Sequence, residues 1–234
     1  MRENQNTIVP SNYNDYIYKL TYQFLAPLVP YIPRKITPNQ ITIAGFFCAL
    51  IGTGLLYFIS TPIAYIDWVI FNLLWFFLDA LDGMHARSSN QGSEYGAFLD
   101  HTLDNIYFIF MLTVFAAKFD LLHLLYLYII ILRVTASAVV FIVQAHTKKV
   151  YLSRVSGGFE TLLFSIAMIL SYCYPTMNPA MLTTDPFLLK WIFLLDLQKG
   201  FFLKCALFPY FIGIPITFFL QFRFVKKELM QSPR

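Results

Sequence analysis

The stretch from Asp79 to Asp104 has the sequence D-A-L-D-G-M-H-A-R-S-S-N-Q-G-S-E-Y-G-A-F-L-D-H-T-L-D. It places four carboxylates, Asp79, Asp82, Asp100 and Asp104, at or inside the ends of two strongly apolar segments. Ionisable side chains are costly at membrane depth, so those that occur there indicate a functional site. Divalent cations are the ions that can offset so much negative charge in a small space. This stretch therefore predicts a divalent-metal site built between two membrane helices.

The composition of the whole chain supports a membrane environment. Of 234 residues, 58% are apolar and only 13% are charged, whereas a soluble domain of this size carries about a quarter charged residues. The chain also contains 25 Phe and 15 Tyr. We expect an all-α, polytopic membrane protein with a single domain over residues 1–234.

Hydropathy predicts six segments of the ~20 residues that a bilayer requires. Together they predict a six-transmembrane-helix bundle with its core at 41–222. The segments are Ile41–Ile59, Ile63–Leu81, Gly96–Ala117, Leu121–Val143, Phe159–Tyr174 and Phe201–Phe222. Residues 1–38 form an N-terminal interfacial segment, in which Tyr16–Tyr31 is apolar and aromatic but is interrupted by Pro27 and Pro30. That pattern favours an amphipathic helix lying in the interface over a span. The segment Phe187–Leu197 is too short to cross and is expected at a surface.

Lysine and arginine predict the orientation, because cytoplasmic loops carry an excess of both. With the N-terminus inside, the outer side receives four lysines, Lys118, Lys190, Lys199 and Lys204, and Arg133 falls within a span. The inner side receives twelve basic residues: Arg2, Lys19, Arg34, Lys35, Arg87, Lys148, Lys149, Arg154, Arg223, Lys226, Lys227 and Arg234. Both termini and the Asp79–Asp104 stretch are therefore expected on the cytoplasmic side.

The spacing of the four aspartates predicts how they meet. Asp79 and Asp82 are three residues apart and Asp100 and Asp104 are four apart, so each pair shares one helix face. Two helices joined by a short loop can point these faces at each other. Hard oxygen donors suit Mg²⁺, Mn²⁺ or Ca²⁺ rather than zinc. Mg²⁺ often completes its shell with substrate phosphate, and a pair of such ions suits displacement at phosphorus.

The residues between the aspartates suit phosphate binding. Gly83 allows a phosphate or base to approach the backbone closely, and Ala86 is a small residue on the same side of the expected pocket. Arg87 can neutralise phosphate with forked hydrogen bonds. Gly96 leaves room at the start of the next helix.

The complete pattern D-x2-D-G-x2-A-R-x8-G-x3-D-x3-D, from Asp79 to Asp104, resembles the signature of the CDP-alcohol phosphatidyltransferase family. The segment Pro38–Thr42 is also similar to the start of that family's first core helix. The resemblance implies a homodimer with six-helix cores, acting on a CDP-linked substrate and a lipid acceptor, and no nucleic-acid partner. It implies that the four aspartates bind two ions, Mg²⁺ or Mn²⁺, which hold the pyrophosphate. It further implies a substrate-binding pocket lined by Asp79, Asn39, Gly83, Ala86, Arg87 and Gly96, with Asp104 as the proposed base and CMP as the leaving group.

His101 points to one branch of that family. The D-H-x-x-D arrangement resembles the choline/ethanolamine phosphotransferases, in which this histidine is the proposed proton acceptor, so His101 and Asp104 are both candidate catalytic bases. The chain departs from that branch in having Ala97 and Thr102 where a glutamate and a glycine are usual. The alternative role for His101 is that of a neighbour to the metal ligands or of an ordinary helix residue.

Two further charged residues admit two interpretations each. Glu160, in Ser156–Glu160 at the start of the fifth span, either faces a cationic headgroup or is a first-turn glutamate that stabilises its helix. Arg133 either pairs with an acidic residue or contacts substrate phosphate. The histidines at positions 85 and 123 are expected in a loop or at the interface, with no functional role.

Three functions compete at this point. The first transfers phosphocholine or phosphoethanolamine from a CDP-alcohol to diacylglycerol. The second keeps the fold but has CDP-diacylglycerol donate a phosphatidyl group to a small alcohol. The third is an ion-coupled transporter, which is disfavoured because the acids lie near one face and glycine is rare within the spans.

Overall fold

A computed structural model describes residues 16–147, 157–198 and 200–231. Over these residues the chain forms α-helices and short 3-10 helices and contains no strand, which confirms the all-α prediction. The helices are α1 (Tyr16–Leu25), η1 (Ala26–Tyr31), α2 (Pro38–Phe58), α3 (Ile63–Ser89), α4 (Glu94–Lys118), α5 (Leu124–Thr147), α6 (Gly157–Cys173), η2 (Pro179–Met181), α7 (Pro186–Leu194) and α8 (Phe201–Gln231).

Each of the six predicted spans overlaps one long helix, namely α2, α3, α4, α5, α6 or α8. Three helical segments of the described chain are long and apolar enough to cross a bilayer: Pro38–Phe58, Ile63–Ser89 and Phe201–Lys227. Two shorter apolar segments lie in α5 and α6. The chain is thus an all-helical membrane protein, and the count of six crossings stays a prediction.

The boundaries around the Asp79–Asp104 stretch differ from the prediction. Helix α3 continues past Leu81 to Ser89 and ends at Asn90, which adopts the left-handed conformation with φ 57°. Helix α4 begins at Glu94, and the hydroxyl of Ser93 caps it by accepting a hydrogen bond from the Gly96 amide. Asp82 and Arg87 therefore project from a continuous helix, which fixes their relative positions more rigidly than a loop would.

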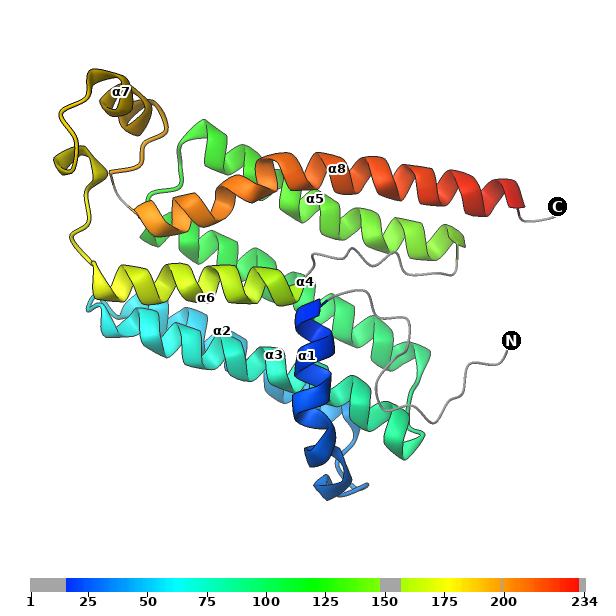
Figure 1. The fold of residues 1–234 in the computed structure, drawn as a ribbon. Helices are drawn as coiled ribbons and strands as arrows, with labels where there is room; N and C mark the ends of the chain where they lie inside the picture. The colour runs from blue at the N-terminus through cyan, green and yellow to red at the C-terminus, as the bar shows by residue number, and fades with distance from the viewer. Residues whose placement is uncertain (1–15, 148–156, 199, 232–234) are drawn as a thin grey trace.

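The helices pack side by side around an aromatic core (Figure 1). Helix α3 contacts α2 and α6, α4 contacts α2 and α5, and α8 contacts α5 and α6. The α2–α3 pair approaches closely at Gly52, where an added Cβ would lie 2.4 Å from the Cβ of Phe71. Buried Trp68, Phe115 and Phe164 fill the space between α3, α4 and α6, with Trp68 and Phe164 each packed edge-on against Phe115.

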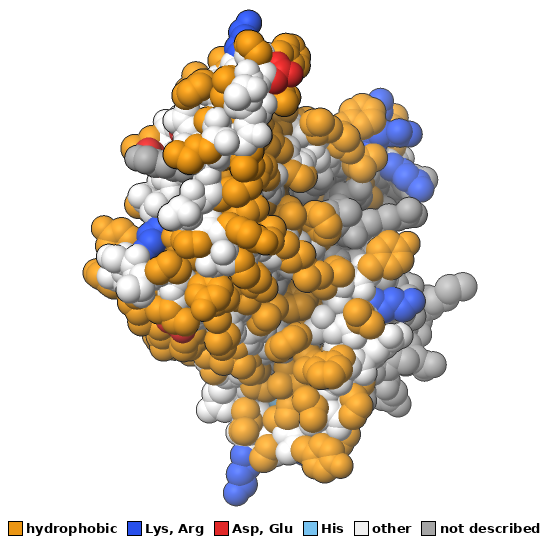
Figure 2. All heavy atoms as spheres, turned by 60° about the vertical axis from the view of Figure 1, so that its left-hand side comes forward, with side chains coloured by type: hydrophobic (Ala, Val, Ile, Leu, Met, Phe, Trp, Pro, Cys, Tyr) orange, Lys and Arg blue, Asp and Glu red, His pale blue; other side chains and the backbone are white. Residues whose placement is uncertain are grey.

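Helix α1 crosses the direction of the long helices, as Figure 1 shows. The turn between α3 and α4 and the end of α8 lie at one end of the bundle, α7 lies at the other, and α6 begins near the middle, beside α1. Apolar side chains cover most of the face drawn in Figure 2, while lysine and arginine lie mainly toward its edges. Of the basic residues used for orientation, Arg2, Lys148, Lys149, Arg154, Lys199 and Arg234 lie outside the described residues. Sidedness stays a prediction.

Candidate active site

The four aspartates project from the adjoining ends of α3 and α4, and we call them the aspartate cluster (Asp79, Asp82, Asp100 and Asp104). Asp82 is buried and the other three are half-buried. The carboxyl groups of Asp79 and Asp100 come within hydrogen-bonding distance across the two helices, and Asp82 and Asp104 interact electrostatically with both. The structure therefore brings together the two helix faces that the spacing predicted.

The aspartate cluster has the chemistry of a cation site. One oxygen of Asp100, Oδ1, is buried and has no hydrogen-bond partner. Within the described residues, candidate ligand atoms of Asp100, His101 and Asp104 lie within 4.8 Å of one another. A buried carboxylate oxygen without a partner is costly unless a cation or a donor satisfies it. Four neighbouring carboxylates with such an oxygen fit divalent cations with hard-ligand preference.

Two hydroxyl groups hold the aspartates from outside the motif. The hydroxyl of Tyr18, on α1, donates to Asp79 Oδ2 at 2.8 Å. The hydroxyl of Thr42, on α2, contacts Asp82 Oδ2. Thr42 lies in the Pro38–Thr42 segment that the sequence singled out, although no role was predicted for it. No sequence pattern indicated that Tyr18 contacts Asp79, because this contact depends on how α1 docks onto the bundle.

The predicted donor-binding residues Asn39, Gly83, Ala86, Arg87 and Gly96 lie on α2, α3 and α4. Asn39, in the first turn of α2, lies over Gly96 at the start of α4, where an added Cβ would come within 2.9 Å of Asn39 Oδ1. On α3, the Arg87 guanidinium folds back over Gly83, with Nη1 3.3 Å from the position of a Cβ at Gly83. Ala86 occupies the same helix and is half-buried. The side chain of Asn39 thus occupies space beside Gly96, and that of Arg87 occupies space beside Gly83, where a larger residue would crowd them.

His101 lies beside the aspartate cluster. Its Nδ1 is 3.8 Å from Asp100 Oδ2, and its side chain is 36% exposed. The imidazole is therefore close to the carboxylates and still accessible to a substrate.

The loop placement predicted for His85 is wrong, because His85 lies within α3. His85 is 2% exposed within α3, and its Nε2 makes a 2.8 Å hydrogen bond with the carbonyl of Ile36. Because α3 extends beyond Leu81, His85 falls on a helix face that packs against the segment preceding α2. This hydrogen bond links that segment to α3.

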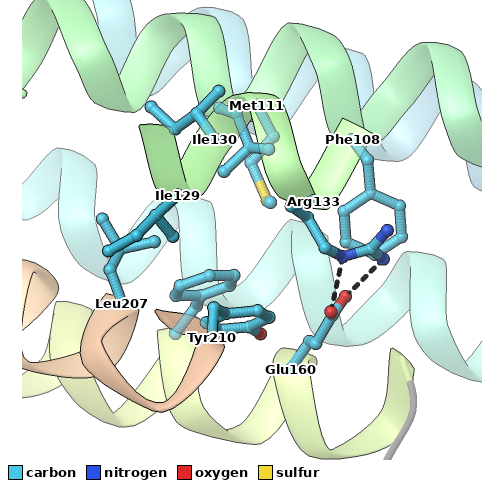
Figure 3. A pocket seen from close by; sticks show the side chains of 10 residues that line it. Phe108, Met111, Ile129, Ile130, Arg133, Glu160, Leu207 and Tyr210 are labelled. Atoms are coloured by element: carbon cyan, nitrogen blue, oxygen red, sulfur yellow. Dashed lines mark hydrogen bonds and ion pairs between the residues drawn. The ribbon is translucent and has the colours of Figure 1, made fainter. Parts of the chain in front are cut away.

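Arg133 and Glu160 form a bidentate ion pair between α5 and α6, and Arg133 also interacts electrostatically with Asp104 of the aspartate cluster. Arg133 Nε lies 2.6 Å from Glu160 Oε1, and Arg133 Nη2 lies 2.8 Å from Oε2. Figure 3 shows the pair in a small pocket of about 10 Å³ with Phe108, Met111 and Tyr210 around it. The guanidinium also lies over the Phe108 ring, 4.8 Å from its centroid. Of the two interpretations of Arg133, the structure shows pairing with an acidic residue.

A second cavity, of about 180 Å³, lies between α4 and α5. Its walls are mostly apolar, and Asn105 and Arg133 are its polar members. Arg133, which lines this cavity, interacts electrostatically with Asp104, so the cavity lies near the aspartate cluster. Its shape and lining suit part of an apolar molecule.

Comparison with known proteins identifies the family of the chain. The family described as CDP-alcohol phosphatidyltransferase matches residues 35–198, which include α2 to α7 and all four aspartates. The chain belongs to the CDP-alcohol phosphatidyltransferase family. The match leaves α1 and α8 outside it.

Several curated proteins are similar to parts of this CDP-alcohol phosphatidyltransferase. Archaetidylinositol phosphate synthase from Pyrococcus horikoshii is 41% identical over 71 residues, which are 30% of this chain and 36% of that protein. Choline/ethanolaminephosphotransferase 1 from Saccharomyces cerevisiae is 27% identical over 154 residues, 61% of this chain and 39% of that protein. Ethanolaminephosphotransferase 1 from Pongo abelii is 31% identical over 110 residues, 41% of this chain and 28% of that protein. The chain thus spans well under half the length of these relatives.

Proposed function

We propose that this protein transfers a phosphoalcohol, phosphocholine or phosphoethanolamine, from a CDP-alcohol to diacylglycerol and releases CMP. One observation carries the proposal. The family's complete set of four aspartates meets at the junction of α3 and α4, with a buried Asp100 oxygen that has no partner. The transferase relatives from yeast and Pongo abelii support the choice of alcohol.

In this proposal, Asp79, Asp82, Asp100 and Asp104 hold two divalent ions, Mg²⁺ or Mn²⁺. When bound, such ions neutralise the phosphate charge and make the phosphorus more susceptible to attack. The protein side chains supply the remaining functions, which are binding, orientation and proton transfer.

The donor substrate is proposed to bind against Asn39, Gly83, Ala86, Arg87 and Gly96. Arg87 places a guanidinium beside Gly83, where the small residue leaves access for a phosphate group. Asn39 offers amide donors and acceptors at the start of α2, beside Gly96, and is proposed to contact the nucleoside part. These contacts would orient the β-phosphorus toward the acceptor hydroxyl.

His101 is proposed to accept the proton of that hydroxyl. A bond forms between the acceptor oxygen and the β-phosphorus, the bond from that phosphorus to the bridging oxygen breaks, and CMP leaves with the electron pair. The exposed part of His101 makes it accessible to an acceptor, whereas Asp104 is assigned to metal binding. Asp104 is the alternative proton acceptor.

Diacylglycerol is proposed to place an acyl chain in the cavity between α4 and α5. That cavity has mostly apolar walls and lies near the aspartate cluster, since Arg133 lines it and interacts electrostatically with Asp104. Glu160 is proposed to have a structural role rather than to bind the headgroup, because Arg133 engages both of its carboxylate oxygens.

A second candidate function is supported by the similarity to an archaetidylinositol phosphate synthase. In this alternative, a CDP-linked lipid donates its phosphatidyl group to a small alcohol. The same aspartates serve both functions, since both reactions release CMP.

The membrane arrangement is proposed from the sequence and the helix order. The helices α2, α3, α4, α5, α6 and α8 cross the membrane, α1 lies in the interface, and the aspartate cluster faces the cytoplasm. The whole is one membrane domain that forms a homodimer.

The two donor types can be separated in one experiment. Purified protein is supplied in parallel with CDP-choline, CDP-ethanolamine and CDP-diacylglycerol, each with a matching acceptor, and the lipid product is identified by mass spectrometry. The proposal predicts phosphatidylcholine or phosphatidylethanolamine from the first two donors. Product from CDP-diacylglycerol alone would establish the second candidate instead.

A further inference from the structure

Helix α1 reaches the aspartate cluster although it lies outside the residues that the family matches. Tyr18 donates a hydrogen bond from its hydroxyl to Asp79 Oδ2 at 2.8 Å. One turn further along, the ring of Tyr22 lies beneath the Arg87 guanidinium, with Cζ 5.6 Å from the ring centroid. Two tyrosines of one helix therefore contact two residues of the proposed donor site.

Packing against α3 and α6 holds these tyrosines in place. The Tyr18 ring meets Phe76 of α3 edge-on, with centroids 4.8 Å apart. At Gly158, the second residue of α6, an added Cβ would lie 2.9 Å from the Cβ of Ile17. Glycine at this position therefore allows α1 to approach α6 closely enough for Tyr18 to reach Asp79.

The two faces of α1 differ sharply. Tyr22 and Leu25 are only 5% and 4% exposed and pack with Ala80 and Met84 of α3. On the other face, Tyr16, Leu20 and Phe24 are 73%, 66% and 70% exposed. Because α1 crosses the long helices (Figure 1), its exposed apolar face is available to the membrane interface.

We propose that α1 is a positioning element of the donor site, in which Tyr18 orients the Asp79 carboxylate for metal binding and Tyr22 orients Arg87 for the CDP phosphates. The proposal rests on the function proposed above and extends it to a helix outside the family match. A hydroxyl that donates to a ligating carboxylate fixes its rotamer, and loss of such a partner typically lowers metal affinity or activity. An aromatic face beneath a guanidinium restricts it by cation–π attraction.

Tyr18→Phe tests the first contact, because it keeps the ring on Phe76 and removes only the hydroxyl. The affinity of the full-length protein for Mn²⁺ alone is measured by electron paramagnetic resonance of the free ion. Tyr18→Phe is expected to weaken Mn²⁺ binding by about 10- to 100-fold with an unchanged melting midpoint. Tyr16→Phe, an exposed tyrosine on the same helix, is the matched control and should bind Mn²⁺ as the wild type does.

Tyr22 is tested through CDP binding, measured by calorimetry at saturating Mn²⁺. Tyr22→Leu is expected to lower CDP affinity by roughly 2- to 30-fold, the effect of losing one cation–π contact. Tyr22→Phe retains the aromatic face and should keep CDP affinity near that of the wild type.

The outcomes separate this inference from the proposed function. If the wild type binds Mn²⁺ and CDP but Tyr18→Phe and Tyr22→Leu bind them equally well, the role of α1 is overturned and the proposed function stands. Equal losses in Tyr16→Phe and Tyr18→Phe would also overturn it, because the hydroxyl contact would not be the cause. If the wild type binds neither Mn²⁺ nor CDP, the proposed function itself fails, and the inference fails with it.

Discussion

Replacing Arg133 by methionine is expected to destabilise the protein strongly. The guanidinium contacts both oxygens of Glu160 at 2.6 and 2.8 Å, and the two side chains are only 19% and 11% exposed. Removal of one partner leaves a carboxylate in a mostly apolar pocket, and breaking a buried pair in this way costs about 3–5 kcal/mol. For a chain of 234 residues, that loss lowers the melting midpoint by roughly 6–20 °C.

The assay is thermal unfolding of purified protein in detergent, followed by intrinsic fluorescence. Replacing both partners, in Arg133→Met with Glu160→Met, should restore most of the lost stability because no unpaired charge remains. Arg223→Met is the matched control. Arg223 is exposed and lies over the Phe219 ring, so its loss should change the free energy of unfolding by no more than about 0.5 kcal/mol.

One pattern of results would refute this reasoning. If Arg133→Met has the same melting midpoint as the wild type but selectively loses CMP release from one CDP-alcohol, the ion pair contributes to substrate binding rather than to the stability of the fold. That result would favour the other interpretation of Glu160, in which it binds the headgroup.

Further predictions concern the base, the topology and the far end of the bundle. His101→Ala should lower turnover roughly 10²–10⁴-fold with CDP affinity unchanged, and a wild-type rate would leave Asp104 as the base. In a cysteine-free background, a membrane-impermeant maleimide should label Gly92→Cys from the cytoplasmic side only and Thr184→Cys from the outside only; the reverse pattern would invert the topology. Lys204 is fully buried and donates to the carbonyl and carboxylate of Asp196 at 2.6 and 2.7 Å. Lys204→Met should therefore cost about 1–3 kcal/mol of stability and leave CMP release unchanged, because Lys204 is in the first turn of α8, and α8 begins at the end of the bundle opposite the turn between α3 and α4 (Figure 1). Lost CMP release in a well-folded Lys204→Met protein would contradict that separation.

The parts of the protein that local sequence determines were predictable. Each long apolar run became a helix, because a chain in lipid must satisfy its backbone hydrogen bonds internally. The three- and four-residue spacings placed each aspartate pair on one helix face, since that relation follows from helix geometry alone. The pairing of Asp79 with Asp100 across α3 and α4 then followed from the short turn between them.

The contacts that depend on docking between distant elements were not predictable. Tyr18 is 61 residues from Asp79, and no periodicity indicates which face of α1 meets α3. Arg133 had several acidic residues as candidate partners, and only the arrangement of α5 and α6, which both pack against α8, selects Glu160. His85 was misplaced because the apolar run ends at Leu81 while the helix continues on polar residues that pack against neighbours.

The most direct test of the central claim is CMP release by purified protein supplied with CDP-ethanolamine and diacylglycerol. The protein is first stripped with a chelator, and Mn²⁺ is then restored, in the wild type and in Asp100→Asn. Asp100→Asn keeps the side-chain shape but removes the anionic ligand whose Oδ1 lacks a partner. The account predicts CMP release by the wild type only after Mn²⁺ is restored and background release by Asp100→Asn under both conditions. Release that persists in chelator, or near-wild-type release by Asp100→Asn, would contradict a metal-dependent transferase centred on the four aspartates.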